Sequence, residues 1–292
     1  MERWDDLRLF LAVARQGTLT AAAEALGVNA STLHRHLGRL EDELGTTIFE
    51  KGPRGYRLTA VGEALMPRAE EVEEAIYAAG RTVRGHDNAV SGEVRITMPV
   101  DLLPVVGPHL VAFRQTCAGV RPVVLAEDAV LDLGRSADVA LRPSQHPPDT
   151  AVGRKLLELA WCRYAPVHCK SDDLPWLHFV GLDHTPAVAW ARRSFDLRAP
   201  VMRVDSVTAM HTLLRATRAQ GLLPCFVGDP DPSLRRVGQP APEASSTLWL
   251  LIHADLRRAA RVRALIDGVV PRLLAERALF EGRAGGSGQA LS

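Results

Sequence analysis

Apolar side chains recur at helical spacing along the first part of the chain. A helix over residues 7–16 carries them on one face, at Leu7, Phe10, Leu11 and Ala14. A longer helix is expected over residues 30–44, where four leucines lie four, three and four residues apart and give an apolar stripe that packs inward. These leucines are Leu33, Leu37, Leu40 and Leu44.

Glycines and small polar residues mark where these helices begin and end. Gly17 is placed to end the first helix, and Thr18 is placed to cap a second one over residues 19–26. Gly27 then allows a sharp turn, and Asn29 is a good N-cap for the third helix. Three helices joined by such tight turns indicate a helix-turn-helix.

The face of the third helix opposite its leucines is small, polar and basic. At 100° per residue it carries Ser31, Arg35 and Gly38, flanked by His34 and Arg39. A helix that enters a major groove requires such a face, because base edges are read by hydrogen bonds.

Two short β-prone runs follow this helix. TTIFE and YRLT are joined by KGPRG at 51–55, which predicts a hairpin with a cationic tip that suits phosphate contacts. The alternative is a three-helix domain with a hairpin exposed to solvent. Such a domain does not require that three helices and a hairpin follow one another in this order. The residues expected at DNA are Thr18, Asn29, Ser31, Thr32, His34, Arg35, Arg39, Lys51 and Arg54.

A heptad pattern runs through residues 60–84, where Thr59 can cap a helix. Its seam positions are Leu65, Ala69, Val72, Ile76, Ala79 and Val83. So narrow a stripe favours pairing with a second copy of the chain. A helix packed on its own domain is the alternative, because two seam residues are alanine. Pro67 should bend the helix or weaken its first turns, and GHDNAVSG at 85–92 is a polar hinge.

From Gly92 onward the pattern alternates between strands and helices. This alternation indicates mostly parallel sheets covered by helices. Strands are expected at 93–97, 120–126, 137–143, 159–167, 177–183, 200–206 and 249–255, and helices at 99–116, 187–196, 207–221 and 257–279.

Two stretches between residues 10 and 65 resemble the amino-terminal domain of LysR-type transcriptional regulators. They are FLAVARQGTLTAAAEALGV and LHRHLGRLEDELGTTIFEKGPRGYRLTAVGEAL, within about 60 consecutive residues without a gap. The resemblance implies a winged helix-turn-helix that binds operator DNA. Where the family usually has Ser-Gln-Pro-Ala-x-Ser, this chain runs from Asn29 to His34 without the glutamine that could bond adenine. The base sequence recognised therefore cannot be taken from other members.

The second part resembles the effector domain of the same family at SGEVRITMPVDLLPVVGPHLVAF, ADVALRP and GLLPCF. The resemblance implies an α/β fold of two lobes, like periplasmic binding proteins, with a small effector in the cleft. The domains expected are a winged helix-turn-helix at 1–59, a linker and dimerisation helix at 60–88, a two-lobed effector-binding domain at 89–284 and a flexible tail at 285–292.

Ligands of open α/β sheets gather beyond the carboxyl ends of strands. Ser206 and Thr208 could offer hydroxyls and helix-start N–H groups to an anion, and Arg142 could pair with a carboxylate. Alternatively, the two hydroxyls only cap their helix and Arg142 forms an internal ion pair. The residues expected at the effector are Thr97, Met98, Pro99, Val100, Asp101, Arg142, His184, Ser206, Val207 and Thr208.

Composition narrows the classes of function. The chain has 292 residues, with 35 basic and 34 acidic side chains, so a local patch must attract DNA. The four cysteines show no metal or disulfide spacing; Cys162 and Cys169 could form a redox-sensing pair, as in peroxide-sensing members of the resembled family, or be ordinary small hydrophobes. We find neither a catalytic motif nor a cofactor motif.

These features predict a DNA-binding regulator that is not an enzyme, needs no cofactor and responds to a small anionic effector. With no signal peptide and no apolar run near the ~18 residues that span a bilayer, we expect it in the cytoplasm. Two copies should pair through residues 60–84, and two such dimers should associate. The alternative is an α/β ligand-binding or enzymatic protein whose helix-turn-helix is an interaction module.

Overall fold

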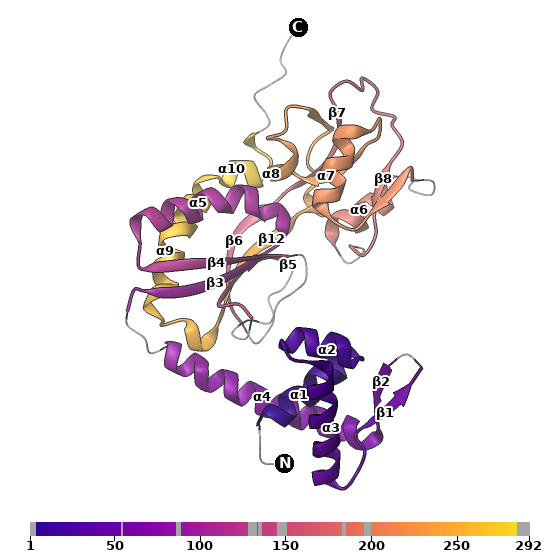
Figure 1. Ribbon diagram of the computed structural model, residues 1–292. Helices are drawn as coiled ribbons and strands as arrows, with labels where there is room; N and C mark the ends of the chain where they lie inside the picture. The colour runs from indigo at the N-terminus through magenta and orange to yellow at the C-terminus, as the bar shows by residue number, and fades with distance from the viewer. Residues whose placement is uncertain are drawn as a thin grey trace. The chain divides into compact units, whose positions relative to one another are not determined.

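The computed structural model separates the chain into two units, residues 1–80 and 81–292 (Figure 1). The residues described are 4–53, 55–85, 89–127, 133, 136–144, 151–182, 185–195 and 200–284. The predicted tail at 285–292 lies outside them.

Three helices begin the first unit, and their ends follow the local sequence signals. Gly17 has a φ of 69° and follows the end of the first helix, and the Thr18 hydroxyl accepts a hydrogen bond from the Ala21 N–H at 3.2 Å, which confirms both predictions. Asn29 precedes the third helix, yet its side chain makes no capping hydrogen bond among the described residues. These helices are α1 (Trp4–Gln16), α2 (Leu19–Leu26) and α3 (Ala30–Leu44).

The core of the first unit forms where α1 and α3 face each other and the hairpin. Phe10 of α1, Leu33 and Leu40 of α3 and Ile48 are fully buried, and Leu37 is nearly so. The predicted inward stripe of leucines is therefore confirmed over most of its length. The polar side chains of α3 lie on the opposite, outer face of the helix.

The hairpin consists of antiparallel strands β1 (Phe49–Gly52) and β2 (Gly55–Leu58). Both strands lie nearer the loop than predicted, so that Lys51 and Gly52 belong to β1 and Gly55 belongs to β2. Gly55, at a φ of 118°, packs against the turn after α1: a Cβ there would lie 2.2 Å from the Gly17 carbonyl oxygen. The Tyr56 N–H donates to that same oxygen at 2.7 Å. The hairpin is thereby fastened to the helices.

Helix α4 (Ala60–Gly85) begins directly after Thr59, whose hydroxyl accepts from the Gly62 N–H at 3.1 Å, as predicted. It runs as one helix through Pro67. The predicted heptad seam is wrong in its first part, because Ala69 is buried in the first unit's own core, where Leu65 also packs. Further along, Val72 and Ile76 are each 41% exposed and Val83 is 75% exposed.

The second unit contains a first lobe around a five-stranded sheet in the order β4-β3-β5-β12-β6. β3 is parallel to β4 and β5, whereas β12 is antiparallel to β5 and β6. Four strands of this sheet therefore run in one direction, as the expected mostly parallel arrangement requires, and β12 runs against them. The reason is that β6 leaves for the second lobe and β12 returns from it. The strands are β3 (Gly92–Met98), β4 (Val120–Ala126), β5 (Val139–Ser144), β6 (Ala151–Leu159) and β12 (Ser246–His253).

Helices α5 (Leu103–Thr116) and α9 (Ala260–Ala275) pack together and against this sheet (Figure 1). A single 3₁₀ turn, η1 (Val100–Leu102), leads from β3 into α5. Short helices α8 (Cys225–Gly228) and α10 (Arg277–Phe280) complete the core, with Phe226 stacked against Phe280 at 5.0 Å between ring centroids.

The second lobe is built on two small sheets. One has the antiparallel order β10-β7-β11, and the other pairs β8 and β9 in parallel. Their core includes Tyr164, Phe179 and Met210, all fully buried or nearly so. The elements are β7 (Trp161–Pro166), β8 (Leu177–Phe179), α6 (Pro186–Ser194), β9 (Met202–Val204), α7 (Val207–Ala216), β10 (Gly221–Pro224) and β11 (Leu234–Val237).

Candidate functional sites

The outer face of α3 presents the first candidate site. Ser31, His34 and Arg35 are exposed, Thr32 is half-buried, and Leu33 between them points into the core. This geometry follows from helical periodicity, since a stripe of buried leucines leaves the opposite face to solvent. The face has hydroxyl, imidazole and guanidinium groups, which can hydrogen-bond to base edges in a major groove.

Arg39 was expected to contact DNA, but the structure gives it another role. Its Nη2 donates to the Asp6 carboxylate of α1 at 2.5 Å, and its Nε lies 3.7 Å from a Glu43 carboxylate oxygen. The Asp6 side chain is 0% exposed, and His36 Nδ1 lies 3.6 Å from the same Asp6 oxygen. Arg39 therefore ties α3 to α1.

The other predicted DNA contacts are placed differently. The Thr18 hydroxyl is engaged in capping α2, whereas Lys51 is exposed on β1. Glu41 sets the position of the hairpin, because one of its carboxylate oxygens accepts from the N–H groups of Ile48 and Phe49 at 2.8 and 3.1 Å. Arg54 lies outside the described residues.

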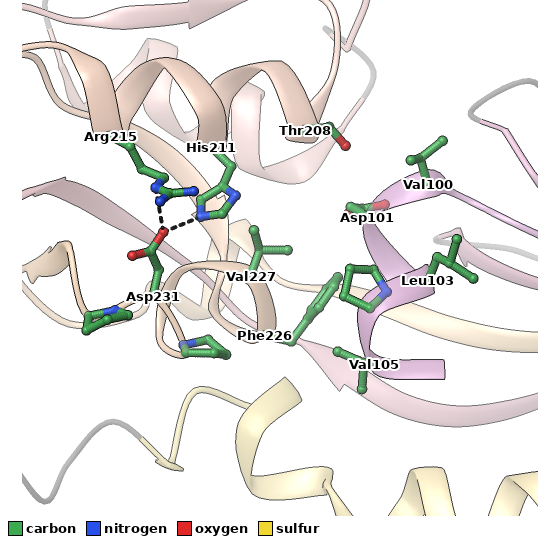
Figure 2. A pocket seen from close by; sticks show the side chains of 13 residues that line it. Val100, Asp101, Leu103, Val105, Thr208, His211, Arg215, Phe226, Val227 and Asp231 are labelled. Carbon is green, nitrogen blue, oxygen red and sulfur yellow. Dashed lines mark hydrogen bonds and ion pairs between the residues drawn. The ribbon is translucent and has the colours of Figure 1, made fainter. Parts of the chain in front are cut away.

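A cavity of about 840 Å³ in the second unit forms the second candidate site (Figure 2). Val100 and Asp101 from η1 stand on one side of it, with Thr208 of α7 on the other. These three were predicted at the ends of two separate strands, and the fold brings them to one cavity. Its lining residues are Val100, Asp101, Leu103, Pro104, Val105, Thr208, His211, Arg215, Phe226, Val227, Pro230, Asp231 and Pro232.

Arg142 does not line this cavity. It is buried, and its guanidinium donates to the Glu127 carbonyl oxygen at 3.0 Å and to the Thr97 hydroxyl at 2.8 Å. Thr97 and Met98 are fully buried. The expectation that Arg142 pairs with an effector in this cavity is therefore wrong, because its hydrogen-bonding groups hold the strand ends of its own lobe together.

Of the remaining residues predicted at the effector, Ser206 caps α7, since its hydroxyl accepts from the Ala209 N–H at 3.3 Å. This is the capping role that the sequence left open as the alternative. Pro99 and Val207 are half-buried beside residues that line the cavity, and His184 lies outside the described residues.

Three polar residues of the cavity were missed at the sequence level. Asp231 accepts from His211 Nε2 at 2.7 Å, and Arg215 Nε lies 3.4 Å from the same carboxylate oxygen, as Figure 2 shows. Ser233 donates to the other oxygen from its N–H and its hydroxyl, at 2.8 and 2.6 Å. Burial alone would raise the pKa of Asp231, but these hydrogen bonds from Ser233 and His211 outweigh it and lower the pKa.

A sequence signal for two of these residues was available. Thr208, His211 and Arg215 are three and four residues apart, which puts them on one face of α7. Asp231 follows α8 and meets that face only through the fold, so spacing could not reveal it.

The buried thiols do not favour redox sensing. Cys162 and Cys169 are both buried, and burial raises the pKa of Cys162 to about 12. Burial likewise raises the pKa of Cys225 to about 11. A reactive cysteine needs an accessible thiolate, so these thiols behave as core side chains. Within the described ranges, no cluster of acidic, histidine and cysteine side chains could hold a metal ion, and no helix is long and apolar enough to cross a membrane.

Comparisons with known proteins match the two parts of the chain in which the candidate sites lie. Residues 4–63 match the family described as "Bacterial regulatory helix-turn-helix protein, lysR family", and residues 87–274 match "LysR substrate binding domain". The probable HTH-type transcriptional regulator LtrA of Klebsiella pneumoniae is 27% identical over 284 residues, which is 90% of this chain and 92% of that protein. PtxR of Pseudomonas aeruginosa, an HTH-type transcriptional regulator, is 36% identical over 49% of this chain and 48% of its own length.

The full-length Vibrio cholerae virulence activator AphB, described as a member of the LTTR protein family, has a similar fold. It aligns with a TM-score of 0.58 at 19% identity, over 92% of this chain and 99% of that chain.

Proposed function

Since this chain belongs to the LysR family of DNA-binding transcriptional regulators, we propose that it binds its operator as a homodimer, with the outer face of α3 in a major groove. Like its named relatives it is a regulator and not an enzyme, and it combines a DNA-binding with an effector-binding domain. The observation that carries the proposal is the exposed polar face of α3 opposite its buried leucines. Because its target is a bacterial operator, we place its action in the cytoplasm.

Arg35 and Lys51 are assigned different parts in DNA binding. Arg35 lies on the face that meets base edges, so Arg35→Ala should cost about 1–3 kcal/mol against the preferred operator and relax specificity. Lys51 lies on the hairpin, where a phosphate contact is expected, so Lys51→Ala should weaken all sequences alike and reduce the salt slope by about one unit.

Selection of operators from a random pool, followed by titration at several salt concentrations, measures both effects. Arg68→Ala is the matched control, because Arg68 is exposed on α4 and paired with Glu71. The assignment of this face is wrong if the Arg35→Ala protein selects the same operator with unchanged affinity.

Pairing is assigned to the later part of α4. Val72, Ile76 and Val83 continue the heptad spacing and are exposed, while the earlier positions are used within the first unit. Ile76→Glu would bury a charge without a partner at this seam, so folded monomers with little operator affinity are expected. Ala75→Glu, at a flanking position where coiled coils tolerate charge, should stay dimeric. Light scattering that finds Ile76→Glu still dimeric would exclude pairing through α4.

We extend this assembly to a dimer of dimers. Sedimentation over a range of concentrations should show a dimer and a tetramer, and the Ile76→Glu protein should form neither through this helix. A species that never exceeds the mass of a dimer would restrict the proposal to one pair.

The small-molecule effector is assigned to the 840 Å³ cavity, whose volume lies within the usual range of about 300–1,000 Å³ for ligand pockets. Binding there can alter regulation only if two conformations differ in affinity for the ligand. Thr208→Val keeps the shape of the wall and removes a hydroxyl. We expect this variant to weaken the response to an effector and to leave operator binding without effector intact. A reporter assay would measure the response, and a DNA titration would measure operator binding.

A further inference from the structure

One acidic side chain of α3 links this helix to the hairpin. The Glu41 carboxylate accepts from the N–H groups of Ile48 and Phe49 at 2.8 and 3.1 Å, and both hydrogen bonds end on the same oxygen. Ile48 is fully buried and Phe49 is 8% exposed, so water does not readily replace this acceptor. A buried N–H group that loses its partner is unfavourable. The position of residues 48–49 therefore depends on Glu41.

The hairpin needs such a support because its own sheet is small. Among the described residues it pairs two strands, and a two-stranded hairpin is marginally stable by itself. β2 is held to the turn after α1, because the Tyr56 N–H donates to the Gly17 carbonyl oxygen at 2.7 Å. The contact of Phe49 with Phe10, at 5.4 Å between ring centroids, is apolar and fixes no direction. Glu41 supplies a second polar attachment, on β1 and from a different helix, so the hairpin cannot pivot about the first one.

The cation of the hairpin lies close to this attachment. Lys51 is exposed on β1, two residues after Phe49, so its place relative to α3 follows the direction of β1. A phosphate contact from the hairpin and base contacts from α3 must fit one duplex at the same time. We propose that Glu41 is a positioning residue for DNA binding, which sets the phosphate contact of Lys51 without touching DNA and leaves the choice of bases to the outer face of α3. This inference rests on the proposed DNA contacts of Lys51 and Arg35.

Substitutions at Glu41 separate the place of the acceptor oxygen from its charge. Glu41→Gln keeps an acceptor at the same place and removes the charge, whereas Glu41→Asp keeps the charge and withdraws the oxygen by one methylene. The Glu41→Gln protein should bind the operator nearly as the unmodified protein does. Glu41→Asp and Glu41→Ala should weaken binding and reduce the salt slope by about one unit, as Lys51→Ala does. Loss of a negative charge would by itself strengthen binding to DNA, so an effect of charge alone has the opposite sign for Glu41→Ala.

Operator titrations of the full-length protein at several salt concentrations measure these effects. The salt slope does not depend on the fraction of active protein, so partial unfolding of a variant cannot imitate the result. Asp42→Ala is the matched control: Asp42 is the next residue of α3, it is exposed, and its substitution removes the same charge and should leave the salt slope unchanged. Operators selected from a random pool by the Glu41→Asp protein should match those of the unmodified protein. If Glu41→Gln lowers the slope as Glu41→Ala does, or if Glu41→Asp leaves it unchanged, the inference is overturned.

A double variant determines whether Glu41 acts through Lys51. If it does, adding Glu41→Asp to Lys51→Ala should reduce the salt slope no further. A second reduction of the same size would mean that Glu41 acts on another contact, which contradicts the inference. Lys51→Ala alone separates the two levels of the argument. If Lys51→Ala reduces the slope and Glu41→Asp does not, the hairpin contact stands and only the role of Glu41 is wrong. If Lys51→Ala leaves the slope unchanged, both the contact and the inference are wrong.

Discussion

Arg39→Ala should destabilise the first unit more than Asp6→Ala, although both changes remove the same ion pair. The Asp6 side chain is 0% exposed and the Arg39 side chain is 40% exposed. Without Arg39, the carboxylate stays in the core, where Oδ2 already lacks a hydrogen-bond partner among the described residues. Without Asp6, the guanidinium can turn into water. The two ends of the pair therefore differ in what their loss leaves behind.

The magnitude follows from this asymmetry. Removing one partner of a buried pair costs about 3–5 kcal/mol, and the half-exposed arginine here points to the lower end, about 3 kcal/mol for Arg39→Ala. Asp6→Ala loses one charge-assisted hydrogen bond, which is about 1.5–2 kcal/mol. In the double variant nothing charged is left in the core, so its cost should be close to that of Asp6→Ala alone. The coupling energy is then about 3 kcal/mol.

Hydrogen exchange of the full-length protein, followed by mass spectrometry, measures the opening free energy of α1 and α3 separately from the second unit. Arg68→Ala is the control: its pair with Glu71 is exposed on both sides and should matter by less than about 1 kcal/mol. The reasoning would be refuted if the two single variants lost the same opening free energy, or if the loss in the double variant equalled the sum of the two single losses.

Two further predictions concern backbone contact and buried thiols. Gly55→Ala would place a Cβ 2.2 Å from the Gly17 carbonyl oxygen, at a residue whose φ is 118°. It should therefore detach the hairpin and lower operator affinity in a mobility-shift assay, while the helix content measured by circular dichroism stays unchanged. Gly52→Ala is the control and should neither detach the hairpin nor lower the affinity, because its Cβ would meet nothing closer than 3.8 Å. Because the pKa values of Cys162 and Cys225 are raised to about 12 and about 11, the unfolded chain loses these protons first as pH rises. The contribution of these two thiols to stability is therefore full below about pH 9 and is lost as the pH rises through about 11 and about 12. A urea midpoint of unfolding that stays constant from pH 8 to 11 would contradict this.

Local signals in the sequence predicted much of the first unit. The leucine stripe of α3 and the caps at Thr18 and Thr59 depend on neighbours within one or two turns, so the sequence alone suffices. The partner of Arg39 lies 33 residues away on another helix, and periodicity places Arg39 beside the groove face without revealing Asp6. The same limit applies to Ala69, which keeps the heptad spacing but packs in the domain core.

Prediction of the second unit failed where pairing between distant segments decides the structure. β6 was not anticipated at all, and the direction of β12 could not be inferred, because a strand's own residues do not specify which neighbours flank it. At the cavity, Thr208 could be named from its place after a strand, whereas Asp231 could not be named because it reaches α7 only in three dimensions. Arg142 was predicted at a strand end but lies within β5, two residues before its end, and its partners determine what it does.

The position of β12 also determines when the first lobe can be completed during synthesis. This strand lies between β5 and β6, yet it is made about 100 residues after β5 ends at Ser144. At roughly 5–20 residues per second, β5 keeps an unpaired edge for about 5–20 s while the second lobe is being translated. Open strand edges invite pairing with other chains. The nascent protein should therefore depend on chaperones during this interval, and a ribosome stalled before Ser246 should carry an aggregation-prone intermediate.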